Sequence, residues 1–198
     1  MDLALYLHAL TAFFVIIDPI GGALVFNSLT NNSDQKHRTL MAIKTVIISA
    51  ALLLLFGNYG EPLLAQLGIN INSLRMSGGL LLFYTAFNMI TKAEEDAAIA
   101  TNNDISVFPM SIPLIAGPGT LTLSILLFSN TSQLSGTIAI AAAIISVLTL
   151  TFAGMVISKY LKKVIGKTGN EILKRFLGVI LAALAIQFVY DGMTNIGL

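Results

Sequence analysis

Long apolar segments limit what this chain can fold into. A helix needs about 20 apolar residues to cross the hydrocarbon core of a bilayer, which is roughly 30 Å thick. The 198-residue chain has six segments near that length, separated by shorter polar stretches. They cover residues 3–29, 40–56, 74–90, 107–128, 137–158 and 172–196. The sequence therefore predicts a multi-pass membrane protein.

The type of membrane-spanning element follows from the pattern inside these segments. Only 11% of the residues are charged, against about a quarter in soluble domains. A spanning barrel strand alternates apolar and polar residues, whereas stretches such as TVIISAALLLLF (45–56) do not alternate. Helices are the other way to pair every backbone group in lipid. We therefore expect an all-α membrane protein with six transmembrane helices.

Composition also excludes several kinds of site. The chain has no cysteine, which rules out disulfides and thiolate metal sites. Its net charge is +1 and no basic stripe lies on a soluble domain, so no nucleic-acid partner is expected. Asp2 stands where a secretory signal would carry Lys or Arg, so we interpret the first segment as a retained helix. No metal and no cofactor is predicted.

The basic residues predict how the chain lies in the membrane. Cytoplasmic loops are enriched in Lys and Arg. All but one of the eleven basic residues fall at or near the loops after the first, third and fifth segments, and the exception is Arg75. Both termini are therefore expected outside the cytoplasm. The ten residues are Lys36, Arg38, Lys44, Lys92, Lys159, Lys162, Lys163, Lys167, Lys174 and Arg175.

The two halves of the chain resemble each other. A polar stretch, TKAEEDAAIATNNDIS (91–106), separates them. RMSGGLLLF begins one hundred residues before RFLGVILAA, which matches Arg75 with Arg175 and Gly78 with Gly178. Because each half has an odd number of spans, the second lies inverted relative to the first, as in many transporters. We predict one transmembrane domain, with repeat 1 at about 1–91, a linker at 92–106 and repeat 2 at about 107–198.

Proline and glycine interrupt the first helix of each half at matching positions. DPIGG (18–22) lies inside the first segment and AGPGT (116–120) inside the fourth. Proline removes a helical hydrogen bond, and glycine lets the backbone leave helical geometry. A lone break of this kind is usually a simple kink. Paired breaks in the two halves indicate a binding site at the bilayer midplane, so helices 1 and 4 are predicted to be discontinuous there.

The two breaks predict the chemistry of the solute. A half-helix that starts at the midplane offers free amides to an anionic group, and Gly21, Gly22, Gly119 and Thr120 are the expected donors. Asp18 and the carbonyls that end the preceding half-helices suit an ammonium group or a cation. A solute that carries both charges would satisfy both ends. The predicted binding residues are Asp18, Pro19, Gly21, Gly22, Gly117, Pro118, Gly119, Thr120 and Thr122.

Asp18 has two compatible interpretations. An intramembrane carboxylate costs about 2.5–3.5 kcal/mol on insertion scales, and such residues often bind or relay ions. Asp18 is therefore a candidate for the coupling ion, either H⁺ or Na⁺. It can also cap the half-helix that follows Pro19. The sequence leaves both roles open.

At these residues the chain resembles the MarC family of bacterial and archaeal inner-membrane proteins, also called the neutral amino-acid transporter family. DPIGGALVF, LRMSGGLLLFYTAFNMI, FPMSIPLIAGPGTLT and GKTGNEILKRFLGVILAALAIQFVYDG carry the resemblance, which covers essentially the whole length. It implies a six-helix inner-membrane transporter of small neutral amino acids such as glycine, alanine or serine. The direction of transport and the oligomeric state, a homo-oligomer included, stay open.

Two other functions compete with amino-acid transport. Some MarC relatives were named for an association with antibiotic resistance, which suggests an exporter of drugs or other small metabolites. Such a site should be roomy and rich in aromatic residues and methionine, whereas the breaks offer glycine and small hydroxyls. An intramembrane hydrolase would need a facing pair of acids or a nucleophile with its base. Asp18 and Asp191 are the only candidate acid pair, at different predicted depths.

Overall fold

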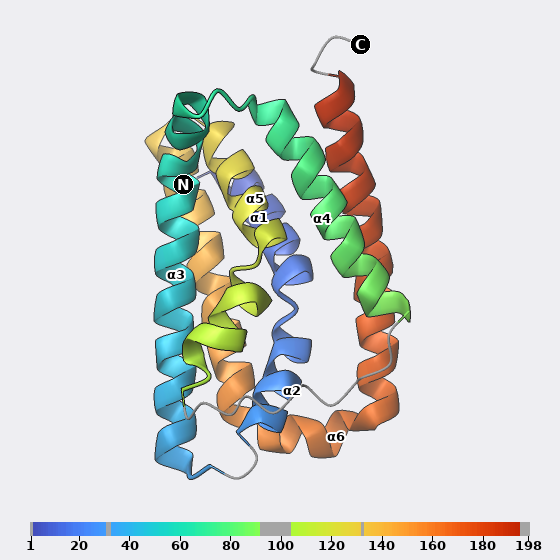
Figure 1. The fold of residues 1–198 in the computed structure, drawn as a ribbon. Coiled ribbons are helices and arrows are strands. Elements are labelled where there is room, and N and C mark those ends of the chain that lie inside the picture. The colour runs from blue at the N-terminus through green and yellow to red at the C-terminus, as the bar shows by residue number, and fades with distance from the viewer. Residues whose placement is uncertain (1, 31–32, 92–103, 132, 195–198) are drawn as a thin grey trace.

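The computed structural model describes residues 2–30, 33–91, 104–131 and 133–194, and the regular elements in these residues are all helical (Figure 1). The predicted all-α class is confirmed. Most of the predicted 92–106 linker lies outside the described residues. The elements are α1 (Leu3–Ile17), α2 (Pro19–Leu29), α3 (Gln35–Gln66), α4 (Ile71–Thr91), η1 (Ser106–Ile115), α5 (Pro118–Ser129) and α6 (Leu134–Thr194).

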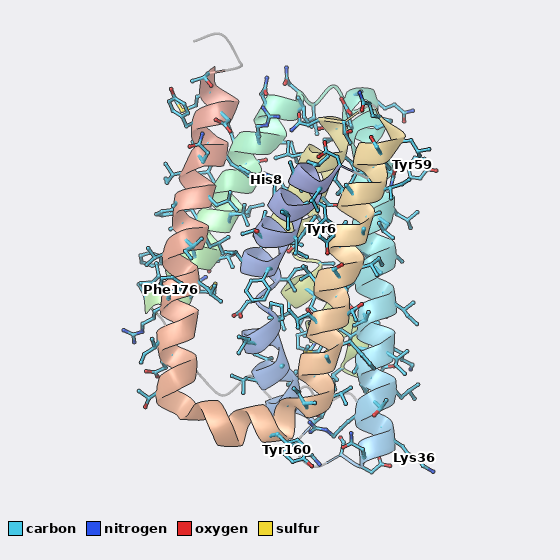
Figure 2. The ribbon with its side chains drawn as sticks, turned by 180° about the vertical axis from the view of Figure 1, so that it is seen from behind. Tyr6, His8, Lys36, Tyr59, Tyr160 and Phe176 are labelled. Atoms are coloured by element: carbon cyan, nitrogen blue, oxygen red, sulfur yellow. The ribbon has the colours of Figure 1, made fainter. Side chains whose placement is uncertain are left out.

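The helices form an elongated bundle in which the start of α1 and the end of α6 lie at the same end, called here the termini end (Figure 1). The opposite end, the far end, carries Lys36 and Tyr160 (Figure 2). α1 and α2 run from the termini end to the far end and pack against α6, whereas η1 and α5 run the other way and pack against α3. α4 lies along the last part of α6. Each interrupted pair thus lies beside a long helix.

α6 differs from the sequence prediction of separate fifth and sixth helices. Helix is continuous from Leu134 to Thr194, yet Figure 1 shows the ribbon turning at the far end and coming back. Its two limbs contain candidate membrane spans at Leu134–Tyr160 and Arg175–Thr194. Between them lie Gly166 and Gly169, which supply the backbone freedom that sharp helix bends need. The polar residues of this stretch continue the helix instead of forming a loop.

Four helical stretches of the described residues are long and apolar enough to cross a membrane, and the bent pair η1–α5 passes the same test as a fifth. α4 spans 21 residues but lies outside this set, because Asn72, Ser73, Arg75 and Ser77 dilute its apolar content. Only 33% of the most apolar window of α3 is buried inside the protein. Such an exposed apolar face suits lipid contact.

Polar caps move helix boundaries beyond the apolar segments. The Asp34 side chain accepts a hydrogen bond from the His37 amide at 3.2 Å, so α3 starts at Gln35 and not at residue 40. At the other end α3 continues past residue 56 to Gln66, and Gly68 then adopts a φ of 70° to turn the chain. Asp2 caps α1 by accepting from the Leu5 amide at 3.1 Å. Apolarity marks the lipid-facing part of a helix and misses its capped polar ends.

One continuous core surrounds the two interruptions. It includes Phe13 and Ile17 from α1, Ile115 from the end of η1, Leu123 from α5 and Leu181 from α6. α5 is held close to α3, since a Cβ on Gly57 would lie 2.6 Å from the Phe128 ring. This packing fixes the start of α5 within the protein.

Candidate functional site

Asp18 alone separates α1 from α2. Its φ of 48° and ψ of 72° place it in the left-handed region. Among the described non-glycine residues, Asp18 alone has a positive φ. Aspartate adopts this conformation more readily than most residues, because its short side chain bonds to nearby backbone. The Asp18 amide donates to the Phe14 carbonyl at 3.1 Å and closes α1. The predicted discontinuity in the first helix is present at this residue.

The half-buried Asp18 also caps α2. Its Oδ1 accepts a hydrogen bond from the Gly21 amide at 3.0 Å, and its carbonyl accepts from the Gly22 amide at 2.8 Å. The two α2 amides that we expected to bind an anionic solute, those of Gly21 and Gly22, are thus hydrogen-bonded within the chain. A Cβ on Gly21 would lie 2.1 Å from Asp18 Oδ2, so a side chain there would disturb this cap.

The second interruption lies between η1 and α5 and bends the chain by 58°. Within η1, Phe108 (φ −126°, ψ 128°) and Ile112 (φ −123°, ψ 123°) leave helical geometry. Each directly precedes a proline, and the proline ring disfavours the helical region for the residue before it. The Ala116 amide donates to the Ser111 carbonyl at 2.8 Å and ends η1. The proline spacing therefore accounts for the irregular backbone.

The start of α5 lacks the cap that α2 has. Gly117, at the N-cap position, has no side chain to accept a hydrogen bond, and Pro118 has no amide hydrogen. The first hydrogen bond joins the Leu121 amide to the Gly117 carbonyl at 2.9 Å. Within the described residues, the amides of Gly119 and Thr120 have no hydrogen-bond partner, although both residues are buried. This end of α5 can therefore donate two hydrogen bonds to a ligand.

Close packing holds that helix start in place. A Cβ on Gly117 would lie 2.3 Å from the carbonyl oxygen of Pro113, and one on Gly119 would lie 2.3 Å from Cδ2 of Leu82. The first contact is with backbone, which cannot rotate away. The glycines at these two positions let η1 and α4 approach the α5 amides closely.

The three hydroxyls that follow on α5 differ in what they contact. Thr122 donates to the Pro118 carbonyl at 2.9 Å and packs against Gly78 of α4, and Ser124 donates to the Leu53 carbonyl of α3 at 2.8 Å. Thr120 is 2% exposed, and its hydroxyl makes no hydrogen bond with any described residue. Of the three, Thr120 is therefore the one available to a solute.

Gly22 lies beside a space large enough for a methyl group. The residue is buried, yet apart from its chain neighbours and the backbone of its own helix, no described atom lies within 4 Å of the position where its Cβ would stand. The neighbouring face of α2 is packed, since a Cβ on Gly154 of α6 would lie 3.3 Å from both the Ala23 Cβ and the Pro19 carbonyl oxygen. Space is thus available on one side of the first turn of α2.

Comparison with known proteins places the chain in a family. The profile described as MarC family integral membrane protein matches residues 3–197. The chain belongs to the MarC family. The predicted resemblance is confirmed.

Curated MarC relatives cover nearly the whole chain. A UPF0056 membrane protein of Methanocaldococcus jannaschii is 31% identical over 98% of both chains. The membrane protein YvbG of Bacillus subtilis is also 31% identical, over 98% of this chain and 96% of its own. These names identify membrane proteins and state no substrate. No solved structure matches the chain.

In this MarC protein the sequence correctly located both interruptions but missed a buried cation at the far end. Arg38 of α3 is 2% exposed and donates to the Thr30 carbonyl at 3.1 Å, to Asn27 Oδ1 at 3.2 Å and to Ser158 Oγ at 2.8 Å. Its guanidinium also lies 5.6 Å from the centre of the Phe26 ring. These contacts tie the end of α2 to α3 and α6. The sequence offered only a basic residue near a predicted loop.

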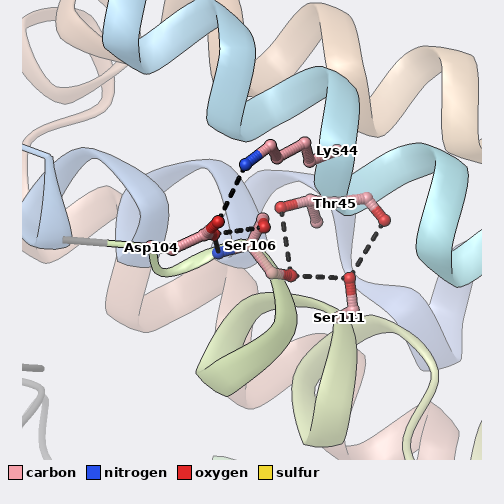
Figure 3. A network of polar contacts seen from close by, with 5 residues as sticks. All are labelled: Lys44, Thr45, Asp104, Ser106 and Ser111. Carbon is pink, nitrogen blue, oxygen red and sulfur yellow. Dashed lines mark hydrogen bonds and ion pairs between the residues drawn. The ribbon is translucent and has the colours of Figure 1, made fainter. Parts of the chain in front are cut away.

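A second polar network joins η1 to α3 (Figure 3). Ser111 donates to the Thr45 carbonyl at 3.1 Å and to the Ser106 carbonyl at 2.7 Å, while Lys44 pairs with Asp104 at 2.8 Å. Hydrogen bonds from Lys44 and then from Ser106 lower the pKa of the exposed Asp104 carboxyl from 3.8 to about 2. The network fixes the start of the interrupted pair.

Proposed function

We propose that this MarC protein is a membrane transporter that binds small neutral amino acids between the two helix interruptions. The observation that carries the proposal is the unequal pair of helix starts. The buried α5 start has two amides without a described partner, and the α2 start carries the Asp18 carboxylate. Ile17 and Ala116, which precede the two break residues, belong to one continuous core.

This arrangement suits a zwitterion. The positive end of the α5 dipole and the amides of Gly119 and Thr120 suit the solute carboxylate. The Asp18 carboxylate suits the ammonium group because the two groups carry opposite charges and a carboxylate oxygen accepts hydrogen bonds from an ammonium. The Thr120 hydroxyl supplies one more adaptable partner. Pro19, Gly21, Gly22, Gly117, Pro118 and Thr122 shape the backbone around these groups.

The size of the proposed solute follows from the residues at the site. Glycine and threonine line the helix starts, and Gly22 has no side chain to fill the space beside it. Promiscuous drug sites rely on adaptable side chains such as methionine. The small residues at these breaks instead favour glycine, alanine or serine.

We further propose that the chain crosses the membrane six times as two inverted repeats, with α4 and both limbs of α6 as spans. The α1–α2 pair of repeat 1 packs on the first limb of α6 in repeat 2, and the η1–α5 pair of repeat 2 packs on α3 in repeat 1. Each interrupted pair therefore packs on the long helix of the other repeat, which supports this plan. Alternating access would arise if one interrupted pair rocked against the other around the shared site. The basic residues around Lys36 favour the far end as the cytoplasmic face of the bacterial or archaeal inner membrane.

Transport is favoured over hydrolysis. Asp191 lines a cavity that Asp18 does not line, which argues against a catalytic pair of these two acids. Asp18 is instead proposed to hold the substrate ammonium or a coupling H⁺ or Na⁺, since intramembrane acids commonly have such roles.

Reconstituted protein provides the test. Proteoliposomes loaded with unlabelled alanine should exchange it for external labelled alanine, glycine and serine, and protein-free liposomes should not. Imposed proton and sodium gradients would then identify the coupling ion through net accumulation. Absence of exchange for all three solutes with correctly inserted, monodisperse protein would reject amino-acid transport.

A further inference from the structure

A cavity of about 240 Å³ lies at the termini end among α1, α4, α5 and α6. Its polar lining residues come from four different elements: His8 of α1, Arg75 of α4, Asn130 at the end of α5 and Asp191 of α6. Its apolar wall includes the buried residues Ala12 and Leu123. Pockets for drug-sized ligands measure about 300–1,000 Å³, so this cavity suits a smaller solute.

The cavity carries one fixed cation and one fixed carboxylate. Arg75 donates from Nη2 to Asn130 Oδ1 at 3.2 Å. A guanidinium has five N–H donors, and the other donors of Arg75 have no partner in the described part of the chain. Asp191 accepts from Gln187 Nε2 at 2.7 Å, which orients its carboxylate. Groups of opposite charge thus line one small cavity.

The cavity walls follow helix faces that lead to the α5 start. On α5, Leu123 and Leu127 line the cavity, and Thr120 lies on the same helical face as both. On α1, His8 and Ala12 are four residues apart and share a face that continues toward Ile16. The cavity is therefore aligned with the interruptions and lies nearer the termini end.

We propose that this cavity is an entry subsite at which a small zwitterionic amino acid binds before it reaches the helix breaks. Arg75 binds the carboxylate, Asp191 binds the ammonium group, and the apolar wall accepts a short side chain. The inference rests on the proposed transport function and adds a second binding position on its path. Charged hydrogen bonds at both ends select zwitterions over simple acids and amines.

The absence of native cysteine allows a direct test. Ala12→Cys places one thiol in the cavity wall, and its reaction with a small methanethiosulfonate reagent is timed in purified protein. Millimolar alanine should slow the reaction about tenfold, whereas equal concentrations of acetate or methylammonium should not. Arg75→Gln and Asp191→Asn should each weaken this protection about tenfold, the factor expected from one charge-assisted hydrogen bond. Leu134→Cys, exposed outside the cavity lining, is the control and should react at an unchanged rate.

Asp18→Asn separates this subsite from the site at the breaks. In the Ala12→Cys background it should leave protection by alanine within twofold of its original value, even if exchange is lost. Protection that survives Arg75→Gln and Asp191→Asn would overturn the subsite. Protection that disappears with Asp18→Asn would also overturn it, because alanine would then be acting from the breaks. A thiol that never reacts, or that alanine never protects, rejects the subsite while alanine exchange still decides the transport function.

Discussion

A methyl group on Gly79 of α4 would lie 2.7 Å from the carbonyl oxygen of Ala185 in α6. The same contact occurs with the helices exchanged, since a Cβ on Gly178 of α6 would lie 3.3 Å from the carbonyl oxygen of Ala86 in α4. In each case a glycine of one helix faces the backbone of an alanine in the other. Small residues at these four positions let α4 and the second limb of α6 approach closely.

The two glycines should differ in their tolerance of alanine. Gly79→Ala meets backbone oxygen at 2.7 Å, whereas the nearest atom to a Cβ at Gly178 is a side-chain carbon of Ile90 at 3.0 Å. Overpacking typically costs about 1–3 kcal/mol, and less when a flexible side chain can move. Gly79→Ala should therefore lower the melting temperature more than Gly178→Ala in size-exclusion thermostability measurements. Equal melting temperatures for both variants and the wild type would contradict this packing.

Asp18→Asn should fold normally and transport poorly. Asparagine keeps an acceptor oxygen for the Gly21 amide and also tolerates positive φ, so the α2 cap survives. It cannot hold a full negative charge or release a proton. We expect a melting temperature close to that of the wild type and a loss of alanine exchange.

Asp18→Ala is the comparison variant. It removes the cap, worth about 1 kcal/mol, and leaves a residue that disfavours positive φ, so its melting temperature should fall. If Asp18→Asn loses only gradient-driven accumulation while exchange persists, Asp18 carries the coupling ion and not the substrate. Full activity of Asp18→Asn in both assays would leave Asp18 as a cap alone.

Gly22→Ala should change substrate preference without unfolding the protein. A Cβ there meets no described atom within 4 Å, so the substitution is sterically allowed. If the solute occupies this space, the added methyl displaces the larger substrates first. One methylene in a pocket changes discrimination by roughly 10–200-fold, and we expect the glycine-to-serine ratio of exchange rates to rise at least tenfold. Competition assays with labelled glycine measure this ratio.

Gly117→Ala is the matched contrast to Gly22→Ala. Its Cβ would lie 2.3 Å from the Pro113 carbonyl oxygen, so the start of α5 must move. This variant should lose stability and exchange of all three solutes together. An unchanged solute preference in a stable Gly22→Ala protein would exclude the space beside Gly22 from the site.

Arg38→Lys should destabilise the far end of the bundle. Lysine carries its donors on one atom and cannot reach the Thr30 carbonyl, Asn27 and Ser158 together as the guanidinium does. A buried polar group left without a partner costs about 1–3 kcal/mol. Thermal denaturation followed by circular dichroism should show a lower midpoint for Arg38→Lys than for Lys36→Arg, an exposed control at the same end. Matching midpoints would show that these bonds add little.

The Lys44–Asp104 pair predicts an acid-sensitive contact between α3 and the start of η1. The pKa of Asp104 is lowered from 3.8 to about 2, so its contribution to stability is fully present above about pH 4 and is lost as the pH falls through about 2. Since both side chains are exposed, the effect should stay within about 1 kcal/mol. The melting-temperature difference between wild type and Asp104→Asn should shrink from pH 6 to pH 2.5. A difference that stays constant over this range would exclude Asp104 as its source.

The sequence predicted the interruptions well because their cause is local. Pro19 and Pro118 begin α2 and α5, and Phe108 and Ile112 leave helical geometry because prolines follow them. The unequal capping was harder to foresee. Asp18 accepts hydrogen bonds from the Gly21 and Gly22 amides, which we had assigned to the solute from the sequence. Gly117 provides no such cap for the corresponding amides of α5.

Groups brought together from distant positions could not be predicted from periodicity. From the sequence, Asp191 was considered only as an acid partner of Asp18, yet Asp191 lines a cavity with His8 and Arg75. Arg75, the basic residue set apart from the other ten, was the available signal for this cavity. Its role could not be inferred without knowing which helices pack against α4. The Arg38 contacts to Asn27 and Ser158 are likewise set by tertiary packing.

The uninterrupted helix of α6 has a mechanical consequence. Its first limb contacts α1 and α2, as the pairing of Tyr6 with Ser146 illustrates, and its second limb contacts α4. A hydrogen-bonded helix joins the limbs at the far end, where a loop was expected. If the α1–α2 pair rocks as proposed, the continuous helix would carry that tilt around the far end to α4, as a bent lever would.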